Sequence, residues 1–99
     1  MDRERQGGWV YIMADRYRGT MYVGMTAHLA QRIHQHRHGD GSDFCRRYGL
    51  TRLVWAERGE AIADCIEQEK RVKRWRREWK FGLIEHGNPE WRDLFGDLV

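Results

Sequence analysis

The fold is decided by residues 9–26, whose sequence is WVYIMADRYRGTMYVGMT. This segment contains two runs rich in β-branched and aromatic residues, 9–15 and 20–25. Between the two runs lie residues 16–19, RYRG, which have the length of a hairpin loop. The segment therefore predicts a β-hairpin of two antiparallel strands.

The register of this hairpin can be predicted from its two faces. If Met13 pairs with Tyr22, one face is aliphatic and both tyrosines lie on the other face, as diagonal neighbours across the strands. A shift by one residue would mix apolar and polar side chains on both faces, so the first register is favoured. The aliphatic face then consists of Val10, Ile12, Ala14, Met21, Val23 and Met25, and the other face of Trp9, Tyr11, Met13, Tyr22, Gly24 and Thr26.

A short helix and a third strand are predicted after the hairpin. Thr26 is the predicted N-cap of the helix, and Leu29 and Ile33 form its apolar stripe. The helix is expected to end near Gly39. A loop rich in Gly, Asp and Ser is expected next. Residues 52–57, RLVWAE, then predict the third strand.

Three helices are predicted in the C-terminal part of the chain. A long helix over about 60–79 is followed by a shorter one over 81–86. Asn88 is expected to cap a last helix, whose apolar stripe consists of Trp91, Leu94, Phe95 and Leu98. The predicted order is β-β-α-β-α-α-α, an α+β fold with a small three-stranded antiparallel sheet flanked by helices. We expect residues 1–99 to form a single domain with a core over about 8–95.

The composition is that of an ordinary globular chain, with 40% hydrophobic and 33% charged residues. The longest apolar run, residues 9–14, is far too short to span a membrane, and the first eight residues contain no apolar signal core. Cys45 and Cys65 are not part of a CxxC pair. Reduced thiols and a cytoplasmic location are therefore expected.

Basic residues are concentrated in one segment, although the net charge is only +3. Between residues 70 and 80 there are seven basic residues and a single acidic one, and Trp75 and Trp79 are interspersed among them. This pattern is suited to a nucleic-acid backbone, and a solvated helix face would explain it equally well. The residues predicted to contact nucleic acid are Lys70, Arg71, Lys73, Arg74 and Arg77.

Arg32 and His36 are a second candidate for chemistry, because residues four apart are neighbours on one face of a helix. Arginine binds phosphate in a bidentate manner, and histidine transfers protons near neutral pH. A surface pair in a polar helix is the alternative interpretation. A zinc site made of nearby histidines and Cys45 is disfavoured, because the spacing matches no zinc pattern.

Glu69 is a third candidate, because it interrupts the apolar seam formed by Ile62, Cys65 and Val72. A carboxylate in such a seam is costly to bury unless it is paired or binds a metal ion. An ion pair with Lys73, one turn further on, would also satisfy it. The sequence leaves both possibilities open.

Taken in order, these residues resemble the motifs of the GIY-YIG nuclease superfamily. Residues 9–11 and 22–26 resemble its GIY and YIG elements, although Trp9-Val10 replaces Gly-Ile in the first. The resemblance covers about residues 8–95, and the segment LIEHGNPEWRDL is similar to small stand-alone bacterial members. The family's further motif positions correspond to Arg32, His36, Glu69 and Asn88.

The resemblance implies a metal-dependent endonuclease that hydrolyses phosphodiester bonds in DNA. Glu69 would bind a single divalent ion, Mg²⁺ or Mn²⁺, and Arg32 would neutralise charge on the phosphate. The alternative is a nucleic-acid-binding module of the same fold with little or no turnover.

The remaining motif residues also receive roles from the resemblance. Tyr11 would take the proton from the attacking water, and His36 would relay that proton or orient Tyr11. Tyr22 would donate a hydrogen bond to the phosphate. Asn88 would brace the site from outside the reacting groups. The predicted catalytic set is therefore Tyr11, Tyr22, Arg32, His36, Glu69 and Asn88.

Overall fold

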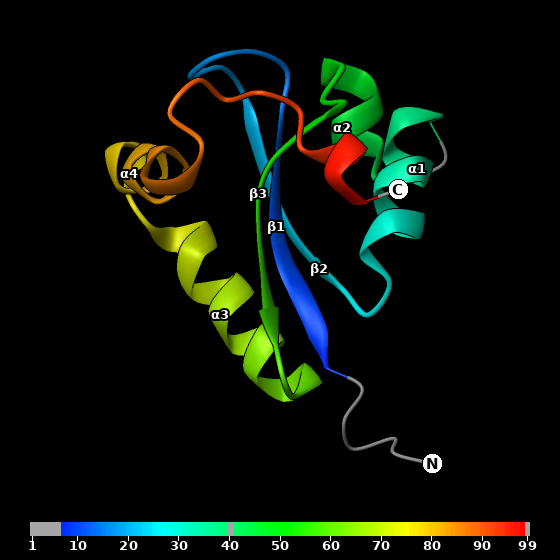
Figure 1. Cartoon of the computed structure of the whole chain (residues 1–99), viewed down its shortest axis with the longest axis vertical. Coiled ribbons are helices and arrows are strands. Elements are labelled where there is room, and N and C mark those ends of the chain that lie inside the picture. The colour runs from blue at the N-terminus through cyan, green and yellow to red at the C-terminus, as the bar shows by residue number, and fades with distance from the viewer. Residues whose placement is uncertain (1–6, 40, 99) are drawn as a thin grey trace.

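The computed structural model describes residues 7–39 and 41–98, which form a three-stranded antiparallel sheet in the order β2-β1-β3 with helices on both faces (Figure 1). Strands β1 (Gly8–Ala14) and β2 (Met21–Thr26) form the hairpin, and β3 (Arg52–Gly59) pairs with the other edge of β1. The predicted register is confirmed, because Met13 lies opposite Tyr22. The α+β class is also confirmed. Residues 1–6 and 99 of the expected domain lie outside the described residues.

Each face of the sheet has its own hydrophobic core. Helices α3 (Ile62–Arg74) and α4 (Arg77–Gly87) lie on one side, and α1 (Leu29–Arg37) and α2 (Asp43–Tyr48) lie on the other (Figure 1). The first core consists of Val10, Ile12, Ala14, Val23, Val54, Cys65, Val72, Ile84 and Trp91. The second consists of Tyr11, Met13, Leu29, Ile33, Cys45, Leu50 and Leu53. The hairpin faces predicted from sequence therefore separate into these two cores.

Helix α2 lies where only a loop was predicted. The Ser42 side chain accepts hydrogen bonds from the backbone amides of Phe44 and Cys45, and Gly49 ends the helix with a φ of 68°. A helix of six residues with only Cys45 buried has no repeating apolar stripe. The sequence features that mark this helix are its N-cap, Ser42, and its C-cap, Gly49.

The helix predicted over residues 60–79 is interrupted. Helix α3 ends at Arg74, the backbone is extended at Trp75 and Arg76, and α4 begins at Arg77. The bend allows α4 to follow the sheet, so that Ile84 packs in the same core as α3. At the start of α1 the predicted cap is also displaced. His28 occupies the N-cap position, and Thr26 accepts a hydrogen bond from the His28 amide.

The predicted last helix is wrong. Residues 88–94 form an irregular segment that crosses the edge of the sheet, and only Phe95–Leu98 form a 3-10 turn, η2. We call residues 88–98 the C-terminal strap. Trp91 is buried in the first core, whereas Leu94, Phe95 and Leu98 pack against the second. The apolar stripe therefore reflects contact with two cores rather than one face of a helix.

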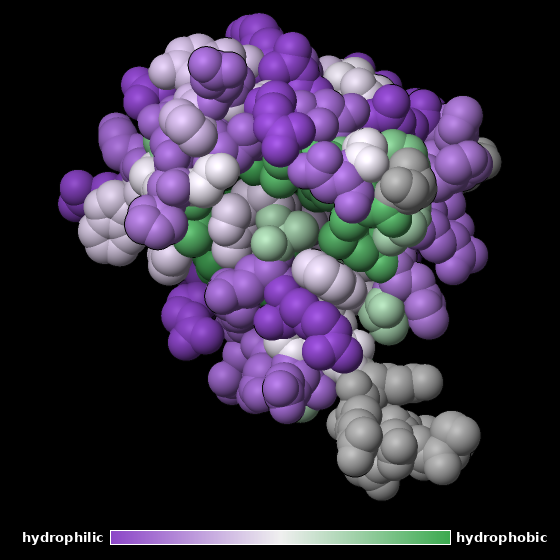
Figure 2. Space-filling view, viewed as in Figure 1, coloured by the Kyte–Doolittle hydropathy of each residue, from purple (hydrophilic) through white to green (hydrophobic). Residues whose placement is uncertain are grey.

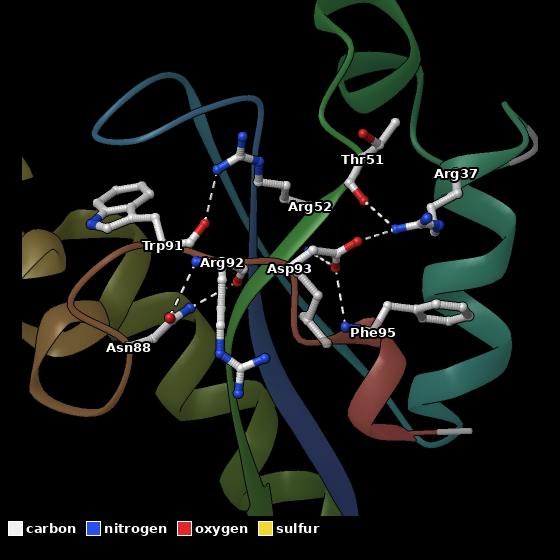
Figure 3. Close-up of polar contacts among 9 residues, drawn as sticks. Arg37, Thr51, Arg52, Asn88, Trp91, Arg92, Asp93 and Phe95 are labelled. Carbon is white, nitrogen blue, oxygen red and sulfur yellow. Dashed lines mark hydrogen bonds and ion pairs between the residues drawn. The ribbon is translucent and has the colours of Figure 1, made fainter.

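Asn88 anchors the start of the strap on β3, and Figure 3 shows its two hydrogen bonds to Arg92 within the strap. Its amide nitrogen donates to the carbonyls of Val54 at 3.1 Å and Arg92 at 2.9 Å. Its amide oxygen accepts from the Arg92 backbone amide at 3.2 Å. Asn88 follows α4 at its C-terminal end, so the prediction that it caps the N-terminus of a helix is wrong.

Asp93 ties the strap to both β3 and α1 (Figure 3). Its carboxylate accepts hydrogen bonds from the backbone amides of Leu53 and Phe95 and forms an ion pair with Arg37. Burial raises the pKa of Asp93, but these hydrogen bonds and the Arg37 charge outweigh burial and lower the pKa below its ordinary value. The carboxylate is therefore ionised at neutral pH, and its contribution to stability is lost as the pH falls through this lowered pKa.

The face along β3 carries an apolar hollow framed by hydrophilic side chains (Figure 2). It is a cavity of about 430 Å³ between α4 and the strap, and its walls include Trp55, Ala56, Leu83 and Leu94. Among the predicted catalytic residues, Asn88 alone lines it. The other candidates lie elsewhere on the molecule.

Asn88→Ala is expected to lower the free energy of unfolding by about 1–3 kcal/mol, because the buried carbonyl of Val54 loses its donor. Urea unfolding followed by circular dichroism would measure this. Glu90→Ala, an exposed change in the same strap, is the control and should stay within about 0.5 kcal/mol of wild type. Equal stabilities of the two variants would contradict the anchoring role of Asn88.

Candidate active site

The centre of the candidate site is a hydrogen bond between Tyr11 on β1 and His36 on α1. The Tyr11 hydroxyl oxygen lies 2.8 Å from His36 Nε2, and the two residues are only 2% and 3% exposed. The ring of Tyr22 lies 6.4 Å from that of Tyr11 and 5.6 Å from that of His36, measured between ring centroids. Three side chains predicted from separate motifs are thus brought together.

Local sequence explains why His36 points inward. Leu29 and Ile33 are one turn apart and bury themselves in the second core, which fixes the face that α1 presents to the sheet. His36 follows Ile33 by three residues and therefore lies on the same face. Tyr11 reaches this face by the alternation of side chains along β1.

Gly24 makes room for the Tyr11 hydroxyl. It lies opposite Tyr11 in the hairpin register, and a Cβ atom there would be 2.6 Å from the hydroxyl oxygen and 2.9 Å from the Tyr22 ring. Neither contact is sterically acceptable, so the close packing of the two tyrosines requires glycine at this position.

A second glycine lies against the other side of His36. A Cβ atom on Gly41 would be 2.6 Å from His36 Nδ1, and the Ser42 backbone amide donates to that nitrogen at 3.4 Å. This long contact at Nδ1 does not fix the tautomer of the imidazole, so either the Tyr11 hydroxyl or His36 Nε2 can donate the hydrogen bond between them.

Electrostatics keep both groups neutral at pH 7. Burial and the nearby charge of Arg32 lower the pKa of His36 below its ordinary value. Burial is also the main cause of a strongly raised pKa of Tyr11; Tyr22 adds to this effect, and Arg32 opposes it. In the absence of substrate, Tyr11 is a phenol rather than a phenolate.

Arg32 lies one turn before His36 on α1, and its charge acts on both Tyr11 and His36. Within residues 7–39 and 41–98, its guanidinium has no hydrogen-bond or ion-pair partner. It lines a polar depression of about 160 Å³ together with Thr26, His28, Gln31 and Gln35. The guanidinium is therefore free to bind an anion.

Glu69 lies on α3, which packs against β1 and β2 on the face of the sheet opposite to Tyr11 and Tyr22. The Glu69 side chain is 15% exposed, and its carboxylate forms an ion pair of 2.7 Å with Lys73, the partner that the sequence suggested. The charge of Glu69 makes a small contribution to the raised pKa of Tyr11. The pKa of Lys73 is raised mainly because Lys73 donates a hydrogen bond to Glu69, and the charge of Tyr22 adds to this. Charges on the two faces of the sheet therefore act on each other.

The donor atoms near Glu69 limit the kind of metal that could bind there. Among the described residues, no three His, Cys, Asp or Glu side chains are grouped so that they could hold an ion. One carboxylate fits a hydrated divalent ion that takes its other ligands from water and a substrate phosphate, as Mg²⁺ does. A closed protein cage does not fit these residues.

Asn88 does not touch this cluster. Its amide is fully used in anchoring the strap to β3, at the opposite edge of the sheet from β2. The structure therefore places Asn88 apart from the other predicted catalytic residues, as a brace of the fold.

The basic residues of α3 and α4 divide into two groups. Lys70, Arg71 and Arg74 line an open cleft of about 490 Å³ together with Trp75. Arg77 instead donates to the carbonyls of Arg18 and Gly19, at 2.8 and 2.9 Å. Arg77 therefore holds the hairpin loop, whereas the residues of the cleft face solvent.

Residues of the segment around α2 were missed as part of the site. Gly41 and Ser42 contact His36, and the Phe44 ring stacks against Tyr22 with a centroid distance of 6.1 Å and an interplanar angle of 29°. The N-cap signal of Ser42 would have placed a helix here. Nothing in the spacing of the sequence would have placed that helix beside Tyr22.

Comparison with known proteins agrees with this geometry. Residues 7–82 match the model of the GIY-YIG catalytic domain, so the chain belongs to the GIY-YIG family, which is of nuclease type and acts on nucleic acid. The chain is similar to a UPF0213 protein of Oceanobacillus iheyensis, with 28% identity over 83% of this chain and 94% of the relative. A UPF0213 protein of Photorhabdus laumondii subsp. laumondii is 26% identical over 77% of this chain and 73% of the relative. No solved structure matches the chain.

In the part of the chain that the structure describes, no helix is both long enough and apolar enough to cross a bilayer.

Gly24→Ala is expected to destabilise the protein by about 1–3 kcal/mol, because the added methyl group must displace the Tyr11 ring. The Tyr11–His36 hydrogen bond should be lost as well, which ¹⁵N NMR of the His36 ring would detect. Gly82→Ala is the control, because a Cβ atom there meets nothing within 4 Å and alanine favours helix by about 0.5–1 kcal/mol. An unchanged His36 spectrum in Gly24→Ala would contradict this description of the site.

Proposed function

We propose that this protein is a divalent-metal-dependent endonuclease that hydrolyses phosphodiester bonds in DNA. The observation that carries the proposal is the buried Tyr11–His36 hydrogen bond, with the free cation of Arg32 and the carboxylate of Glu69 near it. A purely structural tyrosine would need neither an uncompensated arginine nor a carboxylate within electrostatic range. Membership of the GIY-YIG family supports the same conclusion.

Arg32 and Tyr22 would bind the scissile phosphate. The Arg32 guanidinium can donate hydrogen bonds to two phosphate oxygens and would neutralise charge that develops on them during hydrolysis. Tyr22 is half-buried beside the Tyr11–His36 pair, so its hydroxyl can donate a hydrogen bond to the same phosphate. Together they would place the phosphorus next to the Tyr11 oxygen.

Tyr11 would take the proton from the attacking water and pass its own hydroxyl proton to His36. The Tyr11 oxygen lies 2.8 Å from His36 Nε2, and the lowered pKa of His36 keeps the ring neutral, so the tautomer with an unprotonated Nε2 can accept that proton. Tyr11 is then a phenol again after the transfer, and His36 carries the proton as an imidazolium.

Glu69 would hold the metal ion, either Mg²⁺ or Mn²⁺. The ion would polarise the phosphate and stabilise the leaving oxygen. Lys73 is bound to the same carboxylate, so it must release Glu69 when a metal ion binds. Lys70, Arg71 and Arg74 would contact the nucleic-acid backbone from the exposed side of α3.

The Glu69–Lys73 ion pair also favours a second candidate function. A module that binds nucleic acid with little or no turnover would need no metal ion, and Lys73 satisfies Glu69 without one. The two functions differ in whether bound nucleic acid is cut when metal is supplied.

Glu69→Ala is expected to abolish cleavage and to leave nucleic-acid binding unchanged or tighter, because it removes the metal ligand and a negative charge. The assay uses labelled single-stranded, duplex and branched DNA and RNA with Mg²⁺ or Mn²⁺. Glu67→Ala removes an exposed carboxylate two residues away, in the cleft of Lys70, Arg71 and Arg74; it is the matched control and should cut like wild type at saturating substrate. Cleavage by wild type that persists in excess chelator would contradict the metal dependence, and binding without any cleavage would favour the second candidate.

Tyr11→Phe is expected to slow the chemical step by about 10²- to 10⁴-fold, the usual value of a positioned proton acceptor. Phenylalanine fits the same strand position, so substrate binding should remain close to that of wild type, whereas the loss of the partner of the buried His36 should lower the free energy of unfolding by about 1–3 kcal/mol. Tyr22→Phe should cost less, because it removes only a hydrogen bond to the phosphate. Single-turnover rates would measure both, and an unchanged rate for Tyr11→Phe would shift the proton acceptor to His36.

A further inference from the structure

Helix α2 carries two exposed aromatic rings next to the candidate active site. Phe44 is 42% exposed and Tyr48 is 50% exposed, whereas Cys45 on the same helix is buried in the second core. The Phe44 ring lies 4.8 Å from that of Tyr48 and 6.1 Å from that of Tyr22, between centroids. The three rings thus form a row that leads from the Tyr11–His36 pair to solvent.

This row is fixed rather than loosely attached. Ser42 caps α2, Gly49 ends it, and Cys45 anchors it in the core. The rings themselves contribute little to that anchoring, because much of each remains in water. The stability of the fold does not explain why two large aromatic side chains lie together at the surface here. Adjacent exposed apolar side chains of this kind indicate a binding surface.

The charges around the two rings indicate the chemistry of their partner. The Arg47 guanidinium lies 5.7 Å from the centre of the Tyr48 ring and has no ion-pair partner in the part of the chain described. Exposed aromatic faces next to an arginine bind unpaired bases, with the rings stacking on the base and the cation near the phosphate. The patch is small, and the exposed side chains of Asp43, Arg46 and Arg47 surround it. The centre of a protein interface is instead depleted of charge.

We propose that Phe44 and Tyr48 form a stacking platform for an unpaired base of the strand whose phosphate lies at Tyr22, with Arg47 contacting a neighbouring phosphate. The proposal rests on the proposed function and specifies its substrate as a strand that is single or locally unpaired at the cut. In an intact duplex, both faces of an internal base are covered by its neighbours, so such a base cannot stack on the platform.

The test measures binding without turnover, using wild-type protein in excess chelator. The probe is a single-stranded DNA oligonucleotide with one 2-aminopurine, whose position is moved along the strand and whose fluorescence falls on stacking. Phe44→Ala and Tyr48→Ala should each weaken binding by about 5- to 150-fold, the usual value of one base–aromatic stack, and should remove the fluorescence change. Tyr17→Ala, an equally exposed tyrosine on the hairpin loop, is the matched control and should bind like wild type.

Phe44→Leu distinguishes stacking from simple apolar contact. Leucine keeps an apolar side chain and lacks a ring face, so its affinity should fall nearly as far as with alanine. Wild-type affinity in Phe44→Leu, or duplex bound as tightly as single strand, would overturn the proposal. A change in self-association on sedimentation, with unchanged DNA affinity, would also overturn it, because the patch would then join copies of the chain. Fluorescence quenching without cleavage when metal is added would leave the platform in place and refute only the proposed function.

Discussion

The position of one buried hydroxyl group constrains much of this structure. The Tyr11 side chain is almost fully buried, and leaving a buried hydroxyl unpaired costs about 1–3 kcal/mol. His36 supplies its partner, which requires α1 to lie over the hairpin with that histidine turned inward. Gly24 must be without a side chain so that the oxygen can approach β2, and Gly41 must be without one so that His36 can keep its position. Strand, helix and loop are thus each constrained by the same hydrogen bond.

The hairpin could be predicted from sequence because strand periodicity leaves little freedom. A slip of one residue would have moved Val10 and Ile12 to the opposite face of the sheet and mixed apolar with polar side chains on both faces. The order of apolar and polar residues was therefore enough to predict the register. The interruption of an apolar seam likewise identified Glu69 and its partner Lys73. The C-terminal strap could not be predicted in this way. Trp91 packs in the first core and Leu94 packs against the second. The spacing of apolar residues predicts that a side chain is buried, but it does not predict which face of the sheet that side chain packs against.

The same limitation explains which site residues were missed. Helix α2 has a single buried residue, Cys45, and so gives no apolar repeat for its position to be predicted from. Its contacts with Tyr22 and His36 come from residues distant in the chain, and the hairpin and α1 must be in place before those contacts exist. Motif order could name Tyr11, His36 and Arg32, because each belongs to an element with a clear pattern. Phe44 could be found only once the fold had placed it.

The strap covers part of the β3 edge of the sheet and is also linked to α1, the helix that carries His36. On β3 the strap pairs with backbone groups of Leu53 and Val54, which protects part of an otherwise open edge. The β2 edge carries Tyr22, whose ring lies beside Tyr11 and stacks on Phe44 of α2. Asp93 links these regions, because its partner Arg37 directly follows His36 on α1. Since hydrogen bonds and the Arg37 charge keep the pKa of Asp93 low, this link persists at neutral pH and weakens only in acid. The strap therefore holds the helix that positions Tyr11, although it contributes no side chain to the reacting groups.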